Sequence, residues 1–115
     1  MGLNYSRRND ITLYSSDRVA QLTGNGLLTF SPVIPEFDAL YRQDELCYFA
    51  NVDELIAQVE YYTQHPTQAA MIAERGWMRA HSSFATERVC RFMEEVVFRQ
   101  PYSQYYEWQN HVFNR

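Results

Sequence analysis

Short apolar runs separated by polar turns predict three strands. The runs Leu27–Phe30 and Leu46–Phe49 contain few polar residues, and such runs are typical of strands buried in a parallel sheet. The segment 2–6 at the start of the chain is also predicted to be a short strand, and a polar turn at residues 7–10 follows it.

A first helix is predicted between the first two strands, over about residues 16–23. Ser15 and Ser16 offer capping oxygens, and Asp17 places a carboxylate in the first turn. Both features stabilise the start of a helix. The glycine-rich sequence at residues 24–26 ends the helix.

The clearest helical pattern follows the third strand. Asn51 is positioned as its cap, with Glu54 as the capping-box partner. Apolar residues then recur at the spacing of one helix face. They are Val52, Leu55, Ile56, Val59 and Tyr62. The helix is expected to end near His65, because a residue before proline disfavours helix.

Two further helices are predicted, over Thr67–Ala80 and from a cap at Thr86 to Pro101. The buried stripe of the second is expected to consist of Val89, Phe92, Met93, Val96 and Val97. Pro32 and Pro35 bracket a loop before a short helix at residues 36–41. This alternation predicts the α/β class, as a partial Rossmann-like domain with a short parallel sheet of about three strands and a C-terminal run of helices.

Length and charge restrict the possible functions. A chain of 115 residues is one domain at most, since a Rossmann-like half needs on the order of 150 residues. The net charge of −4 argues against nucleic acid as a partner. No apolar run approaches the ~20 residues that span a bilayer, so a cytoplasmic location is expected. Cys47 and Cys90 are expected to be reduced and buried.

The chain is expected to divide into a domain at residues 1–100 and a tail at residues 101–115 that is rich in aromatic side chains. The aromatic residues of the tail are Tyr102, Tyr105, Tyr106, Trp108 and Phe113. A free tail would expose a large apolar patch. It is therefore expected to dock on its own domain, on a missing domain or on a second subunit.

Several motifs resemble, in order, those of group 1 (CgeB-like) glycosyltransferases of the GT-B fold. They are Ser16-Asp17-Arg18, Gly24-Asn25-Gly26 with the strand after it, Asp44 to Phe49, Asn51 to Leu55, His65-Pro66, Ile72-Ala73-Glu74-Arg75-Gly76-Trp77-Met78-Arg79, and His81 to Thr86. The resemblance covers roughly Gly2 to Phe98. It implies one part of the C-terminal half of such an enzyme, which binds the nucleotide sugar.

The expected binding surface is the start of the first helix. In open α/β sheets, ligands bind beyond the carboxyl ends of the strands, and helix N-termini attract diphosphate. Ser15 and Ser16 can donate hydrogen bonds, and Arg18 can pair with phosphate. The alternative is plain capping with a surface ion pair. The resemblance places the ribose-binding position of the family at Gln21, where the family has glutamate. Asp17 is expected on a neighbouring face of the helix.

Other polar residues are interpreted as structural. Arg7 and Arg8 are more simply a solvated turn than a steering patch, and His81 a helix-end residue rather than a base. Close packing explains Gly76 inside a helix. The acidic pairs Asp44-Glu45 and Glu94-Glu95 are interpreted as solvated charges. No catalytic residue, metal site or cofactor is predicted, because the sequence lacks the corresponding motifs.

Two functions remain open. The first is a glycosyltransferase segment that binds a nucleotide sugar or nucleotide diphosphate and is inactive alone, because the N-terminal half that completes the cleft has no counterpart in the sequence. The second is a non-catalytic interaction module that acts as a homodimer or with a partner protein. An exposed edge strand would favour such association.

Overall fold

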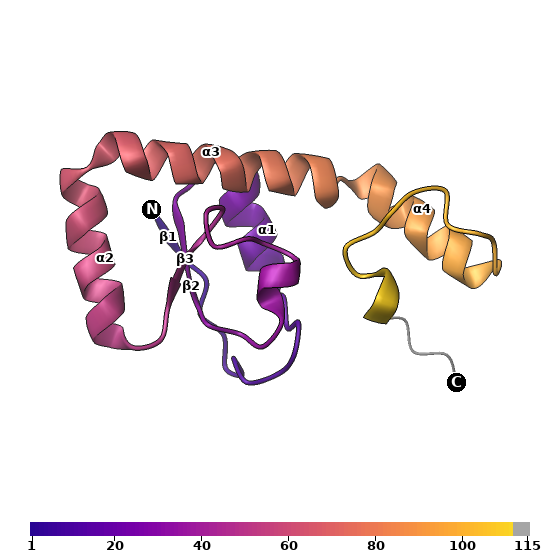
Figure 1. Cartoon of the computed structure of the whole chain (residues 1–115), viewed down its shortest axis with the longest axis horizontal. Helices are drawn as coiled ribbons and strands as arrows, with labels where there is room; N and C mark the ends of the chain where they lie inside the picture. Colours follow the sequence, from indigo (N-terminus) through magenta and orange to yellow (C-terminus); the bar gives the residue numbers. More distant parts are fainter. Residues whose placement is uncertain (112–115) are drawn as a thin grey trace.

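The structure, a computed structural model, describes residues 1–111 and contains a three-stranded parallel sheet (Figure 1). Its strands are β1 (Gly2–Leu3), β2 (Thr29–Pro32) and β3 (Cys47–Phe49), in the order β1-β2-β3. Leu3 is paired with Phe30, and Phe30 with Cys47. The expected α/β fold, a partial Rossmann-like domain with a short parallel sheet, is confirmed.

Helices surround the sheet on three sides (Figure 1). They are α1 (Asp17–Gly24), α2 (Val52–Gln64), α3 (Pro66–Ser83) and α4 (Thr86–Val97), with the short 3₁₀ helices η1 (Phe37–Ala39) and η2 (Gln109–His111). α2 covers one face of the sheet and α1 the other, while α3 runs across the end at which the strands begin. At the opposite end of the sheet, the carboxyl ends of the strands are therefore bordered by loops.

Each face of the sheet has its own apolar core. Val19 of α1 packs with residues of the η1 region, including Phe37, whose side chain has 0% exposure. The second core joins the strands to α2 and α3. Its buried members are Leu28, Phe30, Cys47, Phe49 and Ala73. The two cores hold α1 and α2 on opposite sides of the strands.

Helix α3 approaches the chain before β3 more closely than any side chain would allow. A Cβ atom on Gly76 would lie 2.6 Å from the backbone oxygen of Glu45. One turn later, Arg79 donates two hydrogen bonds to the Glu45 carboxylate through Nε, at 2.9 Å, and Nη2, at 2.9 Å. The expectation that Gly76 serves close packing is confirmed, and Glu45 is a clamped residue rather than a solvated charge.

The C-terminal part of the chain extends away from the sheet (Figure 1). After α4 the tail turns back, and Tyr106, with 0% exposure, packs against Phe92 of α4. Trp108 stacks on Phe84 at a ring distance of 5.5 Å. Of the three docking partners considered for the tail, the structure shows its own chain. Phe113 lies outside the described residues.

The predicted apolar stripes were only partly right. Leu55 and Tyr62 face the sheet, but Val52, Ile56 and Val59 of α2 are exposed. The reason is that α2 lies against one side of the sheet only.

On α4, Phe92 packs on the tail, whereas Met93 and Val97 are exposed. Cys90 is also exposed, not buried as expected. Glu95, expected to be solvated, is 5% exposed and accepts a hydrogen bond from the Tyr106 hydroxyl at 3.0 Å. Its burial follows from the return of the tail.

Several local boundaries differ from the predicted ones. Pro32 is the last residue of β2 rather than part of a loop, and β1 ends at Leu3 rather than at Ser6. Ala85, not Thr86, occupies the cap position of α4. The cap of α2 was correct, since the Asn51 side chain accepts a hydrogen bond from the Glu54 N–H at 2.9 Å. None of the described helices is long and apolar enough to cross a membrane.

Candidate functional site

The start of α1 lies over the carboxyl end of β1. A Cβ atom on Gly2 would overlap Leu22 near the end of the helix, so α1 runs back along β1. In its first turn, the Arg18 guanidinium donates a hydrogen bond to the backbone oxygen of Tyr5, two residues after β1. The helix N-terminus therefore faces the end of the sheet at which ligands bind in open α/β proteins.

Ser15 and Ser16 lead into this first turn. Ser16 has the extended backbone of a cap residue, but among the described residues its side chain makes no capping bond and its buried Oγ has no partner. Ser15 is exposed, and its hydroxyl lies 3.4 Å from the Ser16 backbone oxygen. The first N–H groups of a helix have no hydrogen-bond partner inside it. The start of α1 can therefore donate hydrogen bonds to the oxygens of a diphosphate.

Arg18 and Gln21 lie on the exposed side of α1, three residues apart. The Gln21 side-chain amide donates a hydrogen bond to Asp17 Oδ2 at 3.2 Å. The expectation that Asp17 lies on a different face was wrong, because residues four apart in a helix are neighbours. Gln21, at the expected ribose-binding position, therefore has the Asp17 carboxylate beside it.

A buried polar pair under α1 was not predicted. Asn4 is 3% exposed and donates a side-chain hydrogen bond to Ser31 Oγ at 3.1 Å, which links the ends of β1 and β2. Its Oδ1 atom has no hydrogen-bond partner in residues 1–111. The available sequence signal was weak: a polar residue, Asn4, alternates with Leu3 and Tyr5 at the end of a predicted strand.

Two loops with left-handed backbone meet beside the start of α1. Leu13 and Glu36 have φ angles of 56° and 60°, and the Leu13 N–H donates to the Pro35 oxygen at 2.9 Å. Left-handed backbone at a non-glycine residue costs about 1–3 kcal/mol and is concentrated at binding sites. The second loop borders a cavity of about 220 Å³ whose mostly uncharged lining includes Glu36 and Asp38.

The charges around this end of the sheet are mostly paired locally. Arg8 forms an exposed ion pair with Asp10 at 2.8 Å. The hydrogen bonds from Arg8 lower the pKa of Asp10 to about 2. Arg18 is therefore better placed than Arg8 to meet an anion at the helix start. Over residues 1–111, no three histidine, cysteine or acidic side chains gather in a way that could hold a metal ion.

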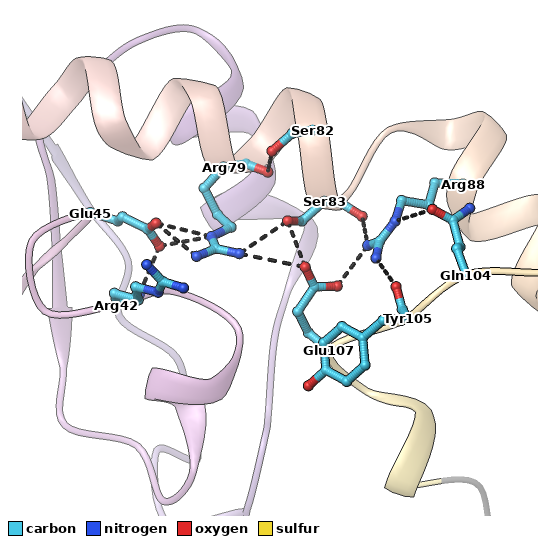
Figure 2. Close-up of polar contacts among 9 residues, drawn as sticks. All are labelled: Arg42, Glu45, Arg79, Ser82, Ser83, Arg88, Gln104, Tyr105 and Glu107. Atoms are coloured by element: carbon cyan, nitrogen blue, oxygen red, sulfur yellow. Dashed lines mark hydrogen bonds and ion pairs between the residues drawn. The ribbon is translucent and has the colours of Figure 1, made fainter.

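A second polar cluster lies at the C-terminal end of α3 and holds the tail (Figure 2). Arg79 joins Glu45 to Glu107, and Arg88 pairs with Glu107 at 2.6 Å. These four side chains are only 11–16% exposed. Burial raises the pKa of Glu107, but the hydrogen bonds from Arg88 and Ser83 outweigh it and leave the pKa below its usual value. Every group in the cluster is paired, so its role is to fasten the tail.

Comparison with protein families gives one match. A family model described as "Glycosyl transferase-like" matches residues 1–95, which include the sheet, helices α1 to α3 and most of α4. No curated protein and no solved structure matches the chain.

Proposed function

Because the chain belongs to the glycosyl transferase-like family, we propose that it is a nucleotide-sugar-binding segment of the CgeB-like, GT-B type. The observation that carries the proposal is the start of α1. It combines a helix N-terminus, two serine hydroxyls and an exposed arginine at the carboxyl end of a parallel strand. This combination suits a diphosphate.

In this proposal the diphosphate of the donor lies on the first turn of α1. In sugar transfer, the bond between the anomeric carbon and the diphosphate oxygen breaks, and an acceptor hydroxyl forms the new bond and loses its proton. Negative charge accumulates on the departing diphosphate. The helix N–H groups and the Arg18 guanidinium would stabilise that charge, together with the hydroxyls of Ser15 and Ser16.

The ribose would lie one turn further along the helix. The Gln21 amide donates to Asp17, which leaves the Gln21 side-chain oxygen free to turn toward a ribose hydroxyl. The Asp17 carboxylate beside it can accept a second hydroxyl, and a charged acceptor strengthens such a bond. Asp17 and Gln21 together would then bind the ribose hydroxyls, in place of the single glutamate expected in the family.

We expect binding without transfer in the isolated chain. In a GT-B enzyme the active site lies between two Rossmann-like halves, and residues 1–111 contain one sheet of three strands. Purified chain incubated with nucleotide sugars and candidate acceptors should form no glycoside. Formation of a glycoside would contradict this part of the proposal.

The second candidate is a non-catalytic interaction module. Exposed apolar residues favour it, above all Val52 and Ile56 on α2 with Met93 and Val97 on α4. Such surfaces are typical of contacts with another protein. In this case the chain would keep the family fold without binding a donor.

Calorimetric titration with uridine diphosphate and guanosine diphosphate separates the two candidates. The first predicts binding to at least one of them, which Arg18→Ala weakens by about tenfold or more, the effect of losing one charge-assisted contact of about 1.5–3 kcal/mol. Arg91→Ala, an exposed arginine on α4, is the matched control and should leave binding unchanged. No binding by the folded wild-type chain would favour the interaction module.

A further inference from the structure

The turn between α4 and the tail depends on one residue in an unfavourable backbone conformation. Arg99 has a φ angle of 52°. The Arg99 N–H donates to the Val96 oxygen at 3.3 Å and the Gln100 N–H to the Glu95 oxygen at 2.8 Å. This is the hydrogen-bonding pattern of a helix end at which glycine is the usual residue in the left-handed position. Here an arginine occupies it.

The tail that follows this turn fills a groove made by the end of α3 and by α4. The Tyr106 hydroxyl donates to Glu95. Glu107 pairs with Arg88, as Figure 2 shows. Arg88 also lies over the rings of Tyr106 and Trp108, at 5.0 and 5.2 Å. The rings and the carboxylate of the tail are therefore matched by the side chains against which they pack.

The turn at Arg99 can act as a hinge, because a second backbone conformation is available to it. Arginine is among the better helix-forming residues, and a right-handed Arg99 would continue α4 instead of reversing the chain. Gln100 precedes Pro101, which disfavours a longer extension. With α4 continued in this way, the tail points away from its own groove, and the groove is left open.

We propose that two copies of this chain form a dimer by exchanging their tails across Arg99. The partner's tail carries the same aromatic rings and the same glutamate, so every docking contact is kept. What changes is the hinge, where two left-handed arginines become helical. A short hinge under strain favours this kind of exchange. The exposed side chains of Val97 and Phe98 lie beside the hinge, where the two chains would meet.

The first test changes the backbone preference of the hinge and measures mass by light scattering over a range of concentrations. Wild-type chain should show a dimer that grows with concentration. Arg99→Gly makes the closed turn easier and should weaken the dimer by at least about tenfold, and Arg99→Val, which avoids a positive φ, should strengthen it. Arg7→Gly, in an exposed loop, is the control. A dimer that does not respond to either change at Arg99 would overturn the proposal.

The second test asks whether the tail itself is exchanged. Glu107→Arg places a positive charge beside Arg88 and Arg79, and Arg88→Glu places a negative charge beside Glu107. Each variant alone should stay monomeric with its tail released. Mixed in equal amounts, the two should form a one-to-one dimer, because each tail then meets a groove of opposite charge.

Circular dichroism checks that both variants keep their helices before mixing, and Trp108 fluorescence follows docking of the tail. A mixture of folded variants that stays at the monomer mass would contradict tail exchange. So would a wild-type chain that remains monomeric at the highest concentration reached, together with a monomeric Arg99→Val. None of these outcomes depends on nucleotide binding, so the donor-binding proposal is tested separately.

Discussion

The α/β unit at residues 1–83 and the extension at residues 84–111 are held together by different forces. The unit has buried apolar cores on both faces of its sheet. In the extension most side chains of α4 are exposed, and the contacts are aromatic rings around Tyr106 and ion pairs around Glu107. The stabilisation from an apolar core grows with the apolar area that is buried. The stabilisation from ion pairs instead depends on salt concentration and pH.

The two regions are joined by a narrow bridge. Phe84 stacks between Tyr41 of the first core and Trp108 of the tail. Arg79 makes a parallel polar connection from Glu45 to Glu107 (Figure 2). Because few contacts cross between the regions, we expect the extension to open without unfolding the sheet, as locally unstable segments do.

The largest effect is expected from Phe37→Ala in the α/β unit. Phe37 is fully buried in the first core, and removing a buried phenylalanine costs about 3–5 kcal/mol. That is a large share of the stability of a small domain, so urea denaturation followed by circular dichroism should show a much lower midpoint. Val33→Ala, at an exposed position, should change little. Comparable losses in both variants would show that this core does not dominate the unit.

A smaller and local effect is expected from Glu107→Gln. The change weakens the pairs with Arg79 and Arg88 and should cost about 1–3 kcal/mol of tail docking. Trp108 fluorescence and hydrogen exchange should report a looser tail, while amides of the sheet stay protected. Glu87→Gln, on the exposed side of α4, is the matched control. If sheet amides lost protection as well, the two regions would be a single cooperative unit.

Lower pH should release the tail before it unfolds the sheet. The pKa of Glu95 is lowered by its hydrogen bond with Ser103, and that of Glu107 by its bonds to Arg88 and Ser83, against burial. A depressed folded-state pKa contributes stability above the ordinary value of 4.5, and this is lost as the pH falls through the folded-state value.

A titration of Trp108 fluorescence from pH 7 downward should therefore show a change below about 4.5, at higher pH than the loss of circular dichroism. Glu107→Gln should reduce the pH-dependent part of docking. If the two signals changed together in the wild-type chain, the extension would not be the weaker region toward acid.

The smallest effect is expected from Asn51→Ala, which removes the cap of α2. Loss of an N-cap side chain costs about 1 kcal/mol. The urea midpoint of the α/β unit should fall slightly, and Trp108 fluorescence at low urea should not change. Gln64→Ala, at the exposed end of the same helix, serves as the control. A looser tail in the Asn51 variant would show that the stability of α2 is coupled to docking of the tail, which the few contacts between the two regions do not predict.

Much of the fold could be predicted from the sequence because its signals are local. The cap at Asn51, the glycines near the end of α1 and the proline that begins α3 act on their immediate neighbours. The apolar runs at β2 and β3 are equally local. Since strands that alternate with helices form parallel sheets, the topology followed from the order of the elements.

The candidate site was only partly predictable. Ser15, Ser16 and Arg18 were expected at a helix start, and their position at the carboxyl end of β1 follows from the parallel topology. Asn4 was missed because its burial depends on Ser31, a residue of another strand. Glu36 was missed because its left-handed backbone arises from the meeting of two loops, which no local pattern encodes.

By itself, the sequence determined the kind, order and approximate ends of the elements, and hence the parallel α/β fold. Only the tertiary structure decided which side of each amphipathic helix is covered, and which charges are buried. Val97 on α4 is 70% exposed although its spacing is that of a core residue, whereas Glu95 on the same helix is buried. The physical reason is that burial depends on which segment packs against a residue, and here that segment is a tail that returns across Arg99.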